Sequence, residues 1–292
     1  MVVSVCLLLA LTTPNNLNNN DNLNNLNNND NMPATLSQVA ARIPDTLQNY
    51  IGGQSVAGQG PIYQVPNPAT GKVLTKYAIS TADDVQDAMT AAAKGQAQWA
   101  ALPPKQRARL LLHAADLLRQ RNDEYAELEA IDTGRPLQET NCVDIVCAYE
   151  CLEYMASLCA TVATAGQHLL CQGATPGASF GYTRREPLGV TAGIGAWNYP
   201  LQSAIWKAAP SLAAGNSMVF KPADNTPVTA LILAQVFTEV RIVVLLLCML
   251  WYCCCVCYCC CGIVYATVAA ALCILRLLRH CVGCYCNNVV VQ

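Results

Sequence analysis

The order of elements in the sequence predicts an α/β fold with a mainly parallel sheet. From residue 179 onward, alternating Gly-rich stretches that favour strands precede apolar stretches with helical period, giving a β-α-β-α order. The connections between these elements are brief. Short alternation of strand and helix is typical of parallel sheets with right-handed crossovers.

The first elements are predicted to be short antiparallel strands followed by a helix. From Tyr50 the chain reads YIGGQSVAG and then VPNPATGKVLTKYAIS, where Gly, Pro and Asn separate short alternating apolar runs. This pattern indicates a small antiparallel arrangement. At Ser80 the apolar period becomes helical, and we expect Ser80 to cap this helix with Asp83 three residues further on.

Two further helices are expected before the strand-helix alternation. One begins at Pro103 or Pro104, because proline is favoured in the first helical turn. Its apolar face comprises Leu110, Leu111, Ala114, Leu117 and Leu118. Gly134 and Pro136 end the next segment, and a long helix is expected over about residues 139–163.

The alternating unit itself begins with a strand, a turn and a second strand over residues 179–195. Asn198 is expected to cap a helix that starts with proline and covers residues 200–212. A short strand at 217–220 then precedes a second proline-started helix at about 227–239. The resulting β-α-β-α order predicts the parallel α/β unit.

Composition divides the chain into three parts. Residues 1–31 consist largely of Asn-rich repeats, which bury too little apolar surface to offset chain entropy, and we expect a dispensable extension or an artefact of the gene model. Residues 32–240 have the composition of an ordinary soluble protein, and their sparse cysteines fit a reducing compartment, hence the cytoplasm. The net charge of -2 shows no excess of Lys and Arg, which excludes nucleic acid as a partner.

The last part, residues 241–292, is apolar and crowded with cysteine. Residues 242–275 carry no charge, and this run exceeds the ~20 residues that span a bilayer, so a transmembrane helix is one interpretation. Cys-x-x-Cys pairs at 257–260 and 281–284 match zinc-site spacing, but dense cysteines make such matches nearly unavoidable, and we expect no metal. Our preferred hypothesis is translation from outside the true reading frame or from an unspliced segment.

A longer motif identifies the α/β unit more specifically. Gly193 and Gly195 begin a dinucleotide fingerprint whose third glycine is replaced by Asn198, which by itself fits a plain tight turn equally well. Residues 181–227 read GYTRREPLGVTAGIGAWNYPLQSAIWKAAPSLAAGNSMVFKPADNTP and carry WNYP, IWK, GN and KPADNTP in order. This stretch resembles the first half of the nucleotide-binding domain of the aldehyde dehydrogenase superfamily, as do PNPATGKV and the two amphipathic helices upstream. The resemblance leans toward the branch that oxidises betaine aldehyde and 4-trimethylaminobutyraldehyde.

The resemblance implies an incomplete aldehyde-dehydrogenase fold: N-terminal helices and strands that lead into a partial Rossmann-like nucleotide domain. It implies NAD(P)-dependent oxidation of a small-molecule aldehyde to a carboxylic acid, with NAD as the cofactor and NADP as the alternative. Full-length members of the family form homo-oligomers. A membrane is implied as a partner only if the apolar tail is genuine.

The resemblance also assigns roles to individual residues. Asn198 matches the family's side-chain donor to the oxyanion of a thiohemiacetal, although an N-cap is the alternative. Lys221 and Asp224 match residues at the adenosine ribose hydroxyls, where an acid repels the 2′-phosphate of NADP. A solvated surface lysine is the alternative for Lys221. The strip beside the cofactor comprises Ile194, Gly195, Ala196 and Trp197, although a tryptophan here can equally belong to the core.

Two aromatic residues extend this comparison to the substrate. Tyr199 and Trp206 are seven residues apart, close to two helical turns, and can share one helix face. In the betaine aldehyde branch, matching aromatics hold a trimethylammonium group by cation-π attraction of about 0.5 to 2 kcal/mol per contact. Ordinary core packing is an equal interpretation.

The catalytic motifs of the family do not follow Lys221. A reactive Cys in a G-Q-x-C setting, a general-base Glu in an E-L-G-G-K setting, a later Glu for the nicotinamide ribose and an F-T-G-S motif are all absent from the sequence. The match to the family is expected to stop near Glu239. We therefore expect a truncated, inactive chain. The alternative is a membrane-anchored, non-catalytic protein that keeps the nucleotide fold for binding or for pairing with full-length relatives.

Overall fold

The computed structural model describes residues 39–170, 180–242, 245–247 and 290–291. The strands are β1 (Thr46–Leu47), β2 (Asn49–Ile51), β3 (Gln54–Val56), β4 (Ile62–Pro66), β5 (Val73–Ala78), β6 (His168–Leu170), β7 (Phe180–Tyr182), β8 (Val190–Ile194), β9 (Ser217–Lys221), β10 (Leu245–Leu247) and β11 (Val290–Val291). The helices are α2 (Ala82–Ala101), α3 (Pro104–Gln120), α4 (Asn122–Thr133), α5 (Leu137–Glu139), the π-helical turn η1 (Thr140–Asp144), α6 (Ile145–Thr164), α7 (Pro200–Ala213) and α8 (Val228–Glu239).

The antiparallel start predicted from the sequence is confirmed. Strands β2 and β3 pair antiparallel, and Gly52 and Gly53 between them adopt positive φ angles of 61° and 84°. Strands β4 and β5 form a second antiparallel pair, and β1 joins β5 in parallel. The turn of this second hairpin closes on Asn67, whose Oδ1 accepts a hydrogen bond from the Ala69 amide at 2.9 Å. These strands form the region that precedes the helices.

The predicted cap of the first long helix is wrong by one residue. Thr81, not Ser80, is the N-cap of α2, because the Asp84 amide donates to Thr81 Oγ1 at 3.3 Å and the Thr81 amide donates to Asp84 Oδ2 at 2.7 Å. This reciprocal pair is a capping box. The Ser80 hydroxyl instead donates to Asn49 Oδ1 in β2 at 2.8 Å. Ser80 therefore links the first strands to the helix rather than capping it.

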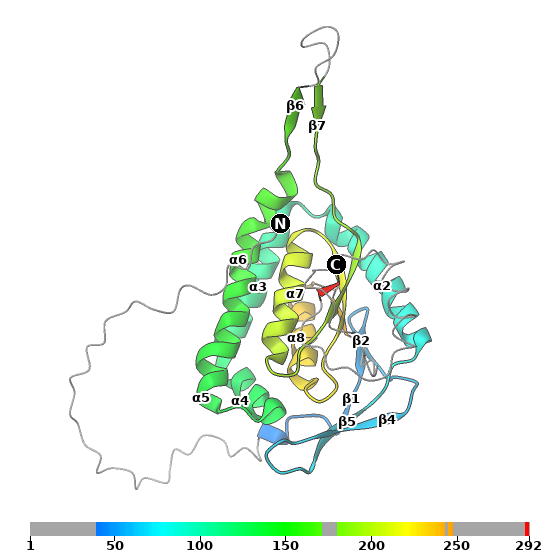
Figure 1. Cartoon of the computed structure of the whole chain (residues 1–292), viewed down its shortest axis with the longest axis vertical. Coiled ribbons are helices and arrows are strands. Elements are labelled where there is room, and N and C mark those ends of the chain that lie inside the picture. Colours follow the sequence, from blue (N-terminus) through cyan, green and yellow to red (C-terminus); the bar gives the residue numbers. More distant parts are fainter. Residues whose placement is uncertain (1–38, 171–179, 243–244, 248–289, 292) are drawn as a thin grey trace, which may run out of the picture. The chain divides into compact units, whose positions relative to one another are not determined.

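The two helices predicted after α2 form a packed pair. Helix α3 begins at Pro104 and lies beside α6 (Figure 1). Of its predicted apolar face, Leu111, Ala114 and Leu118 are completely buried. Gly134 ends α4 in the left-handed conformation, with φ of 75°, as predicted from the sequence. The long helix expected over residues 139–163 corresponds to η1 and α6, with a π-helical turn at its start.

The parallel α/β unit is confirmed by the main sheet. Its order is β11-β8-β9-β10-β2-β3, in which β8, β9 and β10 are mutually parallel. Helix α7 connects β8 to β9, and α8 connects β9 to β10. Strand β10 lies beyond residue 240, where we expected the homologous sequence to end. The parallel strands therefore use residues from the beginning of the apolar tail.

Residues 179–195 contain the expected strand, turn and strand, but the two strands belong to different sheets. Strand β7 pairs antiparallel with β6, whereas β8 enters the main sheet. The β6–β7 ribbon extends beyond the end of α6 (Figure 1). Its exposed apolar side chains include Leu170 and Phe180.

Helices cover both faces of the parallel strands. Val85 and Met89 of α2 pack with Val190 and Val219 in one buried cluster. Side chains alternate along a strand, so Phe220 points to the opposite face, where α7 lies with α8 beside it. This arrangement is a three-layer α/β sandwich, in agreement with the predicted fold class.

Some expectations concern residues outside the described part of the chain. These are the Asn-rich extension at 1–31, the Cys-x-x-Cys pairs at 257–260 and 281–284, and most of the expected transmembrane segment at 242–275. Among the helices of the described residues, none has both the length and the apolar character required to cross a bilayer.

Replacing Thr81 tests the corrected cap. Thr81→Ala removes the hydroxyl that accepts from the Asp84 amide, and we expect the free energy of unfolding to fall by about 1 kcal/mol. Asp83→Ala is the matched control, because exposed Asp83 contributes only a first-turn charge, worth roughly 0.3 to 1 kcal/mol. Urea unfolding measures both, and a larger loss for Asp83→Ala would contradict the assignment.

Candidate functional site

The carboxyl ends of β8 and β9 bring two of the predicted site segments together. Ile194 pairs with Lys221 in the parallel register, and the Gly195 amide donates to the Lys221 carbonyl oxygen at 2.7 Å. Strands β8 and β9 both end at this point, and the chain leaves the sheet after each of them. The carboxyl edge of an open parallel sheet is where α/β folds bind their ligands. The predicted cofactor residues therefore share one edge of one sheet.

Close packing explains the two glycines of β8 and its following turn. A Cβ atom on Gly195 would lie 2.7 Å from Phe220 Cζ, and one on Gly193 would lie 2.9 Å from Met218 Sδ. Contacts this short are not tolerated, so larger residues would push β8 away from the side chains of β9. The glycines are therefore required by strand packing, whether or not a pyrophosphate also approaches them.

Lys221 and Asp224 form an ion pair at the end of β9. Lys221 Nζ donates to Asp224 Oδ1 at 2.6 Å and to the Pro222 carbonyl oxygen at 3.1 Å. The two side chains are 17% and 27% exposed, so Lys221 differs from a freely solvated surface lysine. Asp224 Oδ2 has no hydrogen-bond donor among the described residues. The pair therefore offers an ammonium donor and a carboxylate acceptor side by side, which is the donor set that fits a vicinal diol such as that of a ribose.

The first antiparallel sheet anchors this pair. The Tyr77 hydroxyl of β5 donates to the Asp224 carbonyl oxygen at 3.3 Å. Burial raises the pKa of Tyr77 above its ordinary value, and the neighbouring Asp224 charge raises it further. Tyr77 consequently stays protonated and remains a donor. No local pattern in the sequence indicates this contact, because it joins residues 147 positions apart.

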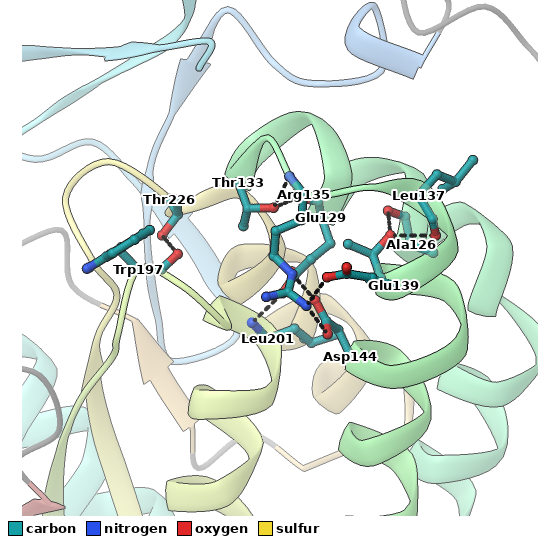
Figure 2. A network of polar contacts seen from close by, with 11 residues as sticks. Ala126, Glu129, Thr133, Arg135, Leu137, Glu139, Asp144, Trp197, Leu201 and Thr226 are labelled. Carbon is teal, nitrogen blue, oxygen red and sulfur yellow. Dashed lines mark hydrogen bonds and ion pairs between the residues drawn. The ribbon is translucent and has the colours of Figure 1, made fainter. Parts of the chain in front are cut away.

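The segment from Ala196 to Asn198 leaves the sheet with few bonds of its own. The Ala196 amide donates to Ser203 Oγ at 3.2 Å, and the Trp197 carbonyl accepts from Thr226 Oγ1 at 3.2 Å (Figure 2). The Trp197 side chain is 50% exposed, so it does not belong to the core. This exposure leaves the indole accessible at the same edge as the ion pair.

The N-cap interpretation of Asn198 is wrong. The N-cap of α7 is Tyr199, and no side chain of the helix itself caps it. Helix α7 starts at Pro200, as predicted, so the residue directly before the proline is the N-cap. Asn198 is half-buried, and its carboxamide makes no hydrogen bond with the described residues. The amide is therefore left available to a ligand.

Tyr199 and Trp206 lie in different environments. The Arg135 guanidinium carbon lies 4.1 Å from the centroid of the Tyr199 ring, a cation-π distance. Trp206, on α7, is 46% exposed. The core-packing interpretation therefore does not hold for Trp206. One face of Tyr199 is already occupied by a cation from the protein.

Buried carboxyl groups near the site were missed by the sequence analysis. Glu129 and Asp132, on α4, are 0% and 1% exposed. Glu129 Oε1 accepts from the Leu201 amide at 3.3 Å, and Asp132 Oδ2 accepts from the Val228 amide at 2.9 Å. Helices α7 and α8 have no cap of their own, so these carboxyls satisfy their first-turn amides. Two acids three residues apart among apolar neighbours, in ELEAIDTG, were the available signal.

Burial determines the protonation of these groups. It raises the pKa of Glu129 from 4.5 to about 8, although the Leu201 amide acts in the opposite direction. Burial also raises the pKa of Asp132 well above its ordinary value, with the Glu129 charge as the second cause. Below neutral pH Glu129 therefore retains its proton while still accepting the Leu201 amide. On the same side of β8, burial lowers the pKa of Lys207 to about 8, and its Nζ donates to the Ser203 carbonyl oxygen at 3.3 Å.

A cavity of about 620 Å³ lies beside α4 and α8. Its lining includes Arg42, Tyr50, Arg121, Tyr125 and Leu231, and none of the predicted site residues. The expected cleft therefore does not coincide with this cavity. In the described part of the chain, no group of three or more His, Cys, Asp or Glu side chains could hold a metal ion.

Comparison with known proteins identifies the fold to which these residues belong. The model of the "Aldehyde dehydrogenase family" matches residues 56–248, about two thirds of the chain. This chain belongs to the aldehyde dehydrogenase family. The match includes β10 and runs past residue 240, so the family resemblance continues into the beginning of the apolar tail.

Solved aldehyde dehydrogenase structures show the same arrangement. A gamma-glutamyl-gamma-aminobutyraldehyde dehydrogenase from Burkholderia cenocepacia is 34% identical, with a TM-score of 0.64 over 73% of this chain and 43% of its own. An aldehyde dehydrogenase from Brucella melitensis biovar abortus is 31% identical, with a TM-score of 0.65 over 71% of this chain and 42% of its own. An indole-3-acetaldehyde dehydrogenase in complex with NAD+ is 32% identical, with a TM-score of 0.66 over 73% and 43%. The chain spans less than half the length of each of these relatives.

The pH dependence of stability tests the protonation of Glu129. Its pKa is raised on folding from 4.5 to about 8, so its contribution is complete below about pH 4.5 and is lost as the pH rises through 8. We expect the free energy of unfolding to fall by a few kcal/mol over this window. Glu129→Gln cannot ionise and should lose most of that dependence while keeping an oxygen for the Leu201 amide.

Glu124→Gln, on the exposed face of the same helix, is the matched control and should retain the wild-type dependence. Urea unfolding at a series of pH values compares the three proteins. Equal slopes for Glu129→Gln and the wild type would show that Glu129 is already ionised in the folded state.

Proposed function

We propose that this chain contributes the nucleotide-binding part of an enzyme that oxidises an aldehyde to a carboxylic acid with NAD. The Lys221–Asp224 ion pair at the carboxyl end of β9, beside the strip from Ile194 to Trp197, carries this proposal. The NAD+ complex of the indole-3-acetaldehyde dehydrogenase relative supports the choice of cofactor. NADP is the alternative.

Different residues of the chain would bind the cofactor and the substrate. The Lys221 ammonium donates to a ribose hydroxyl oxygen, and the free Asp224 Oδ2 accepts from the neighbouring hydroxyl. The same carboxylate repels a 2′-phosphate, which favours NAD over NADP. When bound, the nicotinamide supplies the hydride acceptor. The unpaired Asn198 carboxamide donates to the oxygen that becomes negative when a nucleophile adds to the aldehyde, and a fixed donor there lowers the barrier.

The substrate class that we propose follows from the aromatic residues. A trimethylammonium aldehyde is attracted to an exposed indole by cation-π interaction. Trp206 offers such a surface, whereas Arg135 already covers one face of Tyr199. We therefore assign the larger part of the cation contact to Trp206. The exposed apolar side chains of the β6–β7 ribbon support association with copies of the chain or with full-length relatives.

Nucleotide titration tests the cofactor site. Lys221→Met and Asp224→Ala should each weaken NAD binding about tenfold, because one charge-assisted hydrogen bond to the ribose is lost, while exposed Lys94→Met should leave it unchanged. Asp224→Asn should also reduce the difference in binding affinity between NAD and NADP, because it removes the charge that repels the 2′-phosphate. Isothermal titration calorimetry measures all four variants. Equal affinity of the wild type and Lys221→Met would contradict the assignment.

Turnover is a separate expectation. The sequence has no reactive Cys or general-base Glu in the family's motifs, so we expect this chain alone to bind NAD without oxidising aldehydes. The measurement is NADH formation by the purified chain with betaine aldehyde and with an uncharged aldehyde. Steady NADH production that disappears in Asn198→Ala would overturn the expectation.

A further inference from the structure

The end of α4 reaches the segment that follows β8 through two independent contacts. The Arg135 guanidinium carbon lies 4.1 Å from the centroid of the Tyr199 ring. Glu129 Oε1 accepts from the Leu201 amide at 3.3 Å. The two contacts lie on either side of Pro200, and the first of them is at Tyr199, the residue directly after Asn198. A helix distant in sequence therefore holds the residues next to the unpaired carboxamide.

The Arg135 side chain is itself fixed. Its Nε lies 3.0 Å from Asp144 Oδ2, and its Nη2 donates to Glu139 Oε2 at 3.0 Å (Figure 2). Asp144 is completely buried in the π-helical turn η1, and the Arg135 amide donates to Thr133 Oγ1 at 3.2 Å. Two carboxylates and its own backbone thus orient the guanidinium. A planar cation held in this way selects one position for the aromatic ring stacked on it.

The segment needs such an external support. Pro200 has no amide hydrogen, Tyr199 is the N-cap of α7 without a side-chain cap bond, and Asn198 makes no hydrogen bond with the described residues. The bonds from Ala196 to Ser203 and from Thr226 to Trp197 hold only the first part of the segment. Beyond Trp197, the Ser203 hydroxyl of α7 donates to the Pro200 carbonyl oxygen at 3.1 Å, and the contacts from outside this segment and α7 come from Arg135 and Glu129.

We propose that Arg135 and Glu129 are positioning residues for the segment 197–201, and that they set the direction of the Asn198 carboxamide. The importance of that direction for catalysis rests on the proposed function, whereas the ordering of the segment does not. Arg135 acts through the Tyr199 ring, and Glu129 acts through the first turn of α7. Neither residue is assigned a contact with substrate or cofactor.

Hydrogen exchange of individual amides tests the ordering directly. Glu129→Ala should accelerate exchange of the Leu201 and Ser203 amides about tenfold relative to amides of β9, because the first turn of α7 loses its cap. Glu129→Gln keeps an oxygen acceptor in the same place and should restore slow exchange. If the substitutions acted only through overall stability, their exchange rates would differ throughout the fold and not at the first turn of α7 in particular.

Arg135 requires a paired substitution, because its removal leaves Asp144 buried without a cation. In Arg135→Met combined with Asp144→Asn, we expect faster exchange at Leu201 and Ser203 and a changed environment of the Tyr199 ring in NMR spectra. The single substitution Tyr199→Leu leaves the ion pairs of Arg135 intact and should loosen the same amides. If the double variant fails to fold, this second variant still decides the proposal.

Arg119 provides the matched control. It also lies over a tyrosine, with its guanidinium 4.7 Å from the Tyr149 ring centroid, and also pairs with two acids, Asp116 and Glu153. Arg119→Met removes an equivalent surface contact and should leave exchange in the segment 197–201 unchanged.

Two results would overturn the proposal. One is unchanged exchange at Leu201 in Glu129→Ala and in the Arg135 and Tyr199 variants. The other is equal acceleration throughout β9, which would indicate loss of overall stability rather than of position. A calorimetric NAD titration of the wild-type chain distinguishes the failure of the proposed function from the failure of the positioning role. If the chain binds no NAD but its variants show the expected local exchange, the proposed function is refuted and the positioning role is not.

Discussion

The close approach of β8 and β9 is the constraint on which the candidate site depends. Phe220 lies directly against β8, so there is no room for a Cβ atom at positions 193 and 195, and both residues are glycines. The resulting register pairs Ile194 with Lys221 and ends both strands at the same level. Widening this contact would separate the lysine and its aspartate from the segment that carries Asn198. The chemistry of the edge is therefore set by packing inside the sheet.

The buried carboxyl groups of α4 accept hydrogen bonds from first-turn amides that the prolines beside them leave without a side-chain cap. Helix α7 begins at Pro200 and α8 directly follows Pro227, and neither proline provides a side-chain oxygen for the first free amides. Glu129 and Asp132 supply those oxygens from a third helix. Buried carboxylates are costly, and protonation reduces that cost while keeping the acceptor oxygen. One helix thereby orients both crossovers of the parallel sheet.

Local signals in the sequence predicted most elements, and contacts between distant residues account for what was missed. Periodicity, proline and glycine located the helices and the parallel strands. The predicted cap at Ser80 was wrong because the Ser80 hydroxyl donates to Asn49 instead. The predicted cap at Asn198 was wrong because a carboxyl group of α4 accepts from the first turn of α7. The family motif named Lys221 and Asp224 as a group, but it could not reveal Tyr77, Arg135 or Glu129, whose partners lie far away in sequence. Spacing alone carries no information about such contacts.

The described fold contains the candidate binding edge within its own elements. Strands β8, β9 and β10 with helices α7 and α8 form a continuous parallel unit, and β2 closes its far side in antiparallel pairing. The two charges of the Lys221–Asp224 pair come from the last residue of β9 and the loop that follows it. The groups that we propose to hold a nucleotide thus all belong to elements that the structure describes. The proposed nucleotide binding therefore depends on the folding of this sheet, because the register of β8 and β9 places the groups at that edge.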